Sequence, residues 1–96
     1  LRRLTVDFIL DFKNDSQVVK RRLVEALKAI DANKSQREPA VNATKMDIHG
    51  VTYTAELWIQ YPGEDATERM DKLVTAVDRA VEENEFTRAT VLTQTK

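Results

Sequence analysis

The side chains able to do chemistry are few and lie far apart along the chain. The 96 residues include one histidine and no cysteine, which excludes thiolate chemistry, disulfides and Cys-ligated metals. Asp47, His49 and Glu56 could in principle meet around a turn as metal ligands, but one histidine with two carboxylates near a turn is typical of a solvated hairpin tip. A Ser-His-Asp triad would need His49 with Ser16 or Ser35, and neither serine has the sequence context of a nucleophile elbow.

The remaining carboxylates and glycines give no sign of a catalytic or cofactor site. With two glycines in the chain, neither GxGxxG nor GxxxxGK[ST] occurs, so a phosphate-cradling loop is implausible. Asp7 and Asp11 fall on the outer side of a predicted strand, while Glu64, Asp65 and Glu68 fall at a predicted helix start, where the macrodipole favours ionised carboxylates. Both groups are interpreted as structural rather than as acid–base pairs. We predict no enzyme activity, no catalytic residue, no metal and no cofactor.

Length and charge limit the classes of partner. A chain of 96 residues supports one hydrophobic core, so we expect a single domain over residues 1–96. It begins at Leu1 rather than methionine, which favours a domain excised from a longer chain. The net charge of -1 gives no bulk attraction to nucleic acid or anionic lipid. No stretch approaches the roughly 20 apolar residues that span a bilayer, so the fragment is expected to be soluble, with a membrane contacted only through the parent chain.

Hydrophobic periodicity predicts four strands and two helices that would have to position any site. The strands are expected at Leu4–Lys13, Ala40–Ile48, Val51–Tyr61 and Phe86–Thr95, with helices starting near 14–16 and at 65 and ending near 33 and 84. In the first strand Leu10 and Phe12 fall on the side opposite Ile9 and Asp11. The second strand alternates less regularly, with Thr44, Met46 and Ile48 on one side, which fits an edge strand protected by charge. The β-α-β-β-α-β order predicts an α+β, ferredoxin-like fold: a four-stranded antiparallel sheet with both helices on one face.

The face of this sheet without helices would carry one aromatic residue among acidic and polar ones. Nucleic acids stack on several aromatics beside basic groups, so we predict no nucleic-acid partner. Trp58 with Ile9 beside it would form an exposed apolar patch, which Leu92 joins if the last strand turns that residue outward. A loop or terminal segment could cover the patch; we favour contact with another copy, because tryptophan is enriched at interfaces.

Charge is divided unevenly along the chain. Residues 1–45 carry a net +4 and residues 46–96 a net -5. In the predicted fold, basic residues of the first helix would face acidic residues of the second, namely Lys20, Arg21, Arg22 and Lys28 opposite Glu68, Asp71, Asp78 and Glu82. These groups either neutralise each other on a solvated surface or meet between copies in a ring or dimer.

Several local motifs resemble a known family. They are Arg2-Arg3 just before the first strand, an Asn14-Asp15 helix start followed by Val19, Leu23, Ala26 and Leu27, then Glu38-Pro39, Gly50-Val51 and Leu57-Trp58-Ile59. Over about residues 2 to 61 this string resembles the carboxy-terminal αβ subdomain of small-conductance mechanosensitive (MscS-type) ion channels.

The resemblance implies a non-catalytic cytoplasmic domain below a membrane pore, packed with identical neighbours to form a vestibule. It places Arg2 and Arg3 at the link toward the preceding channel domain and makes Ile9 and Trp58 contact candidates. The alternatives are a regulatory ligand- or metal-sensing domain appended to a transporter and a free-standing interaction or structural domain. A metal sensor would be expected to show several histidines, and whether a small molecule binds stays open.

Overall fold

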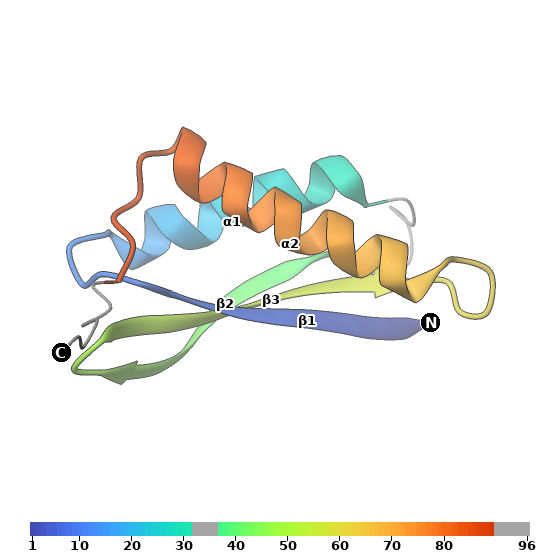
Figure 1. Cartoon of the computed structure of the whole chain (residues 1–96), viewed down its shortest axis with the longest axis horizontal. Helices are drawn as coiled ribbons and strands as arrows, with labels where there is room; N and C mark the ends of the chain where they lie inside the picture. Colours follow the sequence, from blue (N-terminus) through green and yellow to red (C-terminus); the bar gives the residue numbers. More distant parts are fainter. Residues whose placement is uncertain (32–36, 90–96) are drawn as a thin grey trace, which may run out of the picture.

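The computed structural model describes residues 1–31 and 37–89. In chain order the elements are β1 (Arg2–Leu10), α1 (Ser16–Ile30), β2 (Ala40–Asp47), β3 (Gly50–Ile59) and α2 (Ala66–Glu83). The strands form an antiparallel sheet in the order β1-β3-β2. Both helices cover one face of this sheet, α1 over β2 and α2 over β1 (Figure 1). The α+β class and the placement of both helices on one face are therefore confirmed.

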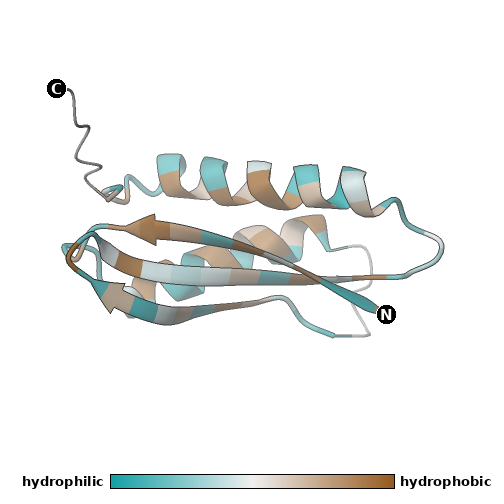
Figure 2. Cartoon of the chain, turned by 60° about the horizontal axis from the view of Figure 1, so that its bottom comes forward, coloured by the Kyte–Doolittle hydropathy of each residue, from teal (hydrophilic) through white to brown (hydrophobic). Residues whose placement is uncertain are grey.

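The core lies between the central strand and the two helices. Along β3 every second residue from Val51 to Ile59 is buried, which confirms the predicted alternation. These side chains meet the buried stripes of both amphipathic helices, including Leu23 and Leu27 of α1 and Leu73 of α2. Figure 2 shows hydrophobic and hydrophilic residues alternating along each helix, as expected when one side of a helix faces a core.

Both helices begin where local capping chemistry predicts. Asp15 caps α1, because its side chain accepts from the backbone N–H of Gln17 at 2.9 Å. Asp65 caps α2 in the same way, accepting from the N–H groups of Thr67 and Glu68 at 2.9 and 3.2 Å. Each carboxylate satisfies amides that the first turn of a helix leaves free.

Phe12, expected on the apolar side of the first strand, is exposed, as are two apolar residues near the end of the second strand. β1 ends at Leu10, because Asp11 starts a turn in which its carboxylate accepts from the N–H of Lys13 at 2.8 Å. Phe12 therefore leaves the sheet and is 49% exposed. In β2 the register shifts between Ala43 and Lys45, and Met46 and Ile48 at the hairpin end are 69% and 88% exposed. The expected position of Phe12 on the apolar side of a strand was therefore wrong.

The fourth strand is present only as a short contact in the described part of the chain. Arg88 forms an isolated antiparallel bridge with Leu10, and the N–H of Asp11 donates to the carbonyl of Thr87 at 3.0 Å. Asn14, one of the predicted capping candidates, instead exchanges two hydrogen bonds with the backbone of Thr87, at 2.8 and 2.9 Å. Residues 90–95 of the predicted strand lie outside the described residues, so the described sheet has three strands rather than the expected four.

Candidate interface

The centre of the open sheet face is a polar, hydrogen-bonded surface. The Thr54 hydroxyl donates to the carboxylate of Asp7 on β1 at 2.7 Å, and the Thr44 hydroxyl of β2 lies 3.3 Å from that of Thr54. These side chains link the three strands across the face that the helices leave uncovered. These polar groups thus satisfy one another across the sheet.

Ile9 and Trp58 lie at opposite ends of this face. In the antiparallel register Ile9 pairs with Thr52, whereas Trp58 pairs with Arg3. Six residues of β3 separate the two positions, which is roughly 20 Å at about 3.3 Å per residue. The expected patch with Ile9 beside Trp58 was therefore wrong, because antiparallel pairing sends one residue to each end of the sheet. Leu92, the third member of that patch, lies outside the described residues.

The chain itself covers part of the Trp58 ring. The guanidinium of Arg37, which precedes β2, lies 4.7 Å from the ring centroid, in a cation–π arrangement. Trp58 is half-buried rather than fully exposed. Sequence reasoning missed Arg37, because a charged residue in a connecting segment carries no local signal of the ring that it contacts.

Arg2 and Arg3 belong to β1 rather than to the segment before it. Their backbones pair with Ile59 and Trp58 of β3, which extends the ladder by two residues beyond the predicted strand start. The Arg2 guanidinium lies 5.1 Å from the centroid of the Tyr61 ring, and Arg3 Nη1 lies 3.5 Å from Glu56 Oε1. Both arginines therefore gather near Trp58, at the end of the sheet where β1 begins.

The hairpin tip is a local turn and does not gather metal ligands. Asp47 Oδ1 accepts from the backbone N–H of His49 at 2.9 Å, and this bond, aided by the charge of Lys45, holds the pKa of the Asp47 carboxyl below its usual value. Glu56 pairs with Thr5 near the far end of the sheet and contacts Arg3. Within residues 1–31 and 37–89, no three His, Cys, Asp or Glu side chains come together in a way that could hold a metal ion.

In the ion pairs described next, each charged residue of one helix contacts a residue that does not belong to the other helix. Arg88 Nη2 contacts Asp78 at 2.8 Å and Glu82 at 3.8 Å. On the α1 side Lys28 contacts Glu38 at 3.6 Å, and Arg22 pairs with Glu25 within its own helix. The ion pairs that the described residues form thus do not include the expected contacts between the basic group of α1 and the acidic group of α2.

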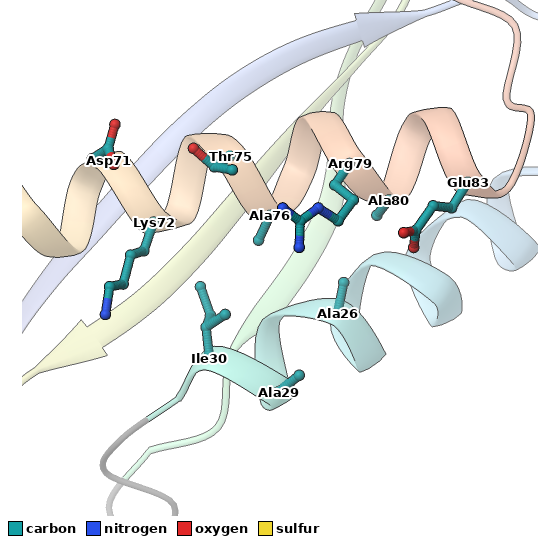
Figure 3. A pocket seen from close by; sticks show the side chains of 10 residues that line it. All are labelled: Ala26, Ala29, Ile30, Asp71, Lys72, Thr75, Ala76, Arg79, Ala80 and Glu83. Atoms are coloured by element: carbon teal, nitrogen blue, oxygen red, sulfur yellow. The ribbon is translucent and has the colours of Figure 1, made fainter.

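Small residues line the space between the helices instead. A groove of about 360 Å³ runs between α1 and α2 and is floored by alanines of both helices (Figure 3). Its rim carries Lys72, Arg79 and Glu83, a mixed set of charges. The groove explains the missing ion pairs, because close helix packing through alanine leaves the longer charged side chains on the rims and outer flanks.

Arg69 is the buried charged residue that joins the two helices. It is 8% exposed, its Nη2 donates to the carbonyl of Ile30 at the end of α1, and its Nε lies 3.3 Å from Glu64 Oε1. The predicted helix pattern gave no sign of this role, because the acceptor lies 39 residues away.

Comparison with known proteins identifies the fold. No protein-family model and no curated protein sequence matches the chain. Among solved structures, MscS of Helicobacter pylori in its closed state matches at 13% identity with a TM-score of 0.72, covering 99% of this chain and 39% of that one. The MSL1 variant A320V of Arabidopsis thaliana matches at 10% identity and a TM-score of 0.74, covering 94% and 35%. The chain thus spans less than half the length of either protein.

The fold is that of a domain of MscS-type channels, the family that the sequence motifs resemble. Within the residues that the structure describes, neither helix combines the length and apolar character needed to cross a bilayer.

Proposed function

We propose that this chain is a non-catalytic domain of an oligomeric mechanosensitive channel. It would stand on the cytoplasmic side of the cell membrane and pack with identical neighbours to form the wall of a vestibule. The observation that carries the proposal is the structural match, which covers nearly all of this chain but about a third of each MscS-type structure. Such coverage is expected of one domain taken from a longer channel subunit.

The surface of the domain supports an assembly role better than a catalytic one. The open sheet face is a satisfied polar surface with Ile9 at one end and an arginine–aromatic cluster at the other, made by Arg2, Arg3, Arg37, Trp58 and Tyr61. In the proposed channel Arg2 and Arg3 lie toward the preceding domain, and Ile9, Trp58 and Leu92 contact other parts of the assembly. In this proposal membrane tension is sensed by other parts of the channel. This domain influences assembly and gating through its contacts with neighbouring subunits.

Recording from the full-length parent protein tests this function. The parent is reconstituted in liposomes, and suction is applied to excised patches. We expect a conductance that opens with tension, and we expect a parent lacking residues 1–96 to assemble poorly and to lose most of that current. A parent that transports solute without responding to tension would overturn the proposal and favour a regulatory domain of a transporter.

A further inference from the structure

The side of α1 that points away from α2 carries a group of basic residues. At about 100° per residue, Lys20, Arg21, Val24 and Lys28 share the side of α1 that points away from α2, and we call them the basic flank. Two observations support this placement. Lys28 contacts Glu38, next to β2, and the α1 residues that line the groove toward α2 are Ala26, Ala29 and Ile30, on the other side of the helix.

The outer side of α2 carries the opposite charge. Val74, Asp78 and Glu82 recur at helical spacing and form the acidic flank together with Asp71, which also lines the edge of the groove toward α1. Val74 and Asp78 line a hollow of about 180 Å³ together with β1, on the side of α2 away from α1. Figure 3 shows the Asp71 side chain directed away from α1, in contrast to Lys72, which extends toward it.

The two flanks are opposite in charge, and each contains one valine among three charged residues. Val74 is 45% exposed, whereas Val24 is half-buried and packs partly against the core of its own chain. Because α1 lies over β2 and α2 over β1, the flanks occupy opposite sides of the molecule (Figure 1). One molecule cannot bring its own two flanks together, whereas two molecules side by side can.

Contacts within the chain neutralise only part of either flank. Lys28 is paired with Glu38, while Lys20 and Arg21 have no ion pair among the described residues. On α2, Arg88 contacts both Asp78 and Glu82, so one guanidinium partly neutralises two carboxylates. Asp71 is a third carboxylate of the acidic flank. Each flank therefore keeps an excess of charge that a second copy would complement.

We propose that the basic flank of one copy packs against the acidic flank of the next, with Val24 against Val74. This contact deepens the proposed assembly function and rests on it. The two surfaces are different, so the contact is heterologous, and its repetition closes into a ring when the rotation between neighbours allows. Opposite charge selects the register of the two helices, and the valines supply the apolar centre.

Disulfide trapping tests the contact directly, because the chain has no native cysteine. The double variant Val24→Cys/Val74→Cys of this chain is oxidised at its highest soluble concentration. We expect a ladder of linked dimers, trimers and larger species on a non-reducing gel. The control Val24→Cys/Thr5→Cys places the second thiol on the open sheet face and should stay mostly monomeric. Arg21→Cys/Asp78→Cys is the second pair in case the Val24 change lowers stability. If neither cysteine pair gives a stronger ladder than the control, the proposed contact is wrong.

Charge reversal provides an independent test. Lys20→Glu/Arg21→Glu makes both flanks acidic, and Asp71→Lys/Asp78→Lys makes both basic. Each variant alone should self-associate at least about tenfold more weakly than the unchanged chain, because like charges would then meet. An equimolar mixture should regain association between unlike copies. Unchanged association of the single variants, or a mixture that stays monomeric although both variants give folded circular dichroism spectra, contradicts the contact.

The two proposals fail in distinguishable ways. A disulfide ladder combined with a parent that shows no tension-gated current would keep the contact and remove the channel function. A tension-gated parent whose flank cysteines never link would keep the function and remove the contact.

Discussion

At the scale of single residues, the side chains that matter most bind segments that are distant in sequence. Arg69 joins α2 to the end of α1 through the Ile30 carbonyl, and Arg37 covers the Trp58 ring. Neither role could be predicted, because each depends on which segments the fold brings together. Asp15 and Asp65 were predictable as helix caps, since a cap needs only its own first turn.

Replacing Arg69 with methionine should lower the free energy of unfolding by about 2 kcal/mol. The change leaves the partly buried carbonyl of Ile30 at the end of α1 without its donor and removes a charge-assisted bond. Urea unfolding followed by circular dichroism measures the effect. Arg79→Met, on the exposed rim of the groove, is the matched control and should stay within about 0.5 kcal/mol. Equal losses for the two variants would contradict the role given to Arg69.

The Asp47 carboxyl should titrate below the ordinary aspartate value of about 3.9. Its ionised form accepts from the His49 backbone N–H, so the folded pKa is depressed. The resulting stabilisation is present above the unfolded pKa and is lost as the pH falls through the folded pKa. Carbon-detected NMR titration measures this pKa. His49→Ala should leave it low, because the donor is the backbone, and an ordinary value in the unchanged chain would refute the account.

At the scale of elements, alternation and capping located the helices and the central strand well, whereas strand ends depended on distant partners. Val51 to Ile59 of β3 alternate in burial because successive side chains point to opposite faces of the sheet and the helices cover only one of them. Phe12 was misplaced, because the turn at Asp11 ends β1 earlier than the alternation predicts. A period of two predicts which residues share a side, but it does not predict where a ladder stops.

The β2–β3 hairpin should depend strongly on Gly50. Its φ is +143°, and a Cβ there would lie 2.4 Å from the carbonyl oxygen of Leu10 on β1. Gly63 is a matched control, because its φ is +140° but the nearest atom would be the Gln60 oxygen at 3.4 Å. Gly63→Ala should cost about 1–2 kcal/mol from backbone strain alone. Gly50→Ala should cost clearly more, since the obstructing atom is backbone, and equal melting temperatures for both variants would contradict this.

At the scale of the whole molecule, the chain is a two-layer domain with two chemically different sides. The uneven division of charge along the sequence becomes a basic flank on α1 and an acidic flank on α2, because each helix lies over a different edge strand. The sequence shows how charge is divided along the chain, but it does not show which side of each helix carries that charge. The expected pairing between helices was replaced by a groove floored with alanine, and Asp78 and Glu82 of α2 contact Arg88 rather than a residue of α1.

The flank contact should weaken with salt. Ion pairs that are exposed before association are screened over about 10 Å at 0.1 M ionic strength and over about 3 Å at 1 M. Disulfide trapping of Val24→Cys/Val74→Cys should therefore decline as sodium chloride rises from 0.1 M to 1 M. A yield that increases with salt would indicate an apolar contact through other residues, such as Met46 and Ile48 at the hairpin end.

Sedimentation equilibrium of the unchanged chain shows whether this domain binds identical copies of itself. We expect an average mass that rises with concentration above that of one chain and returns toward it in the variant Lys20→Glu/Arg21→Glu. A single-chain mass at every concentration would contradict this expectation.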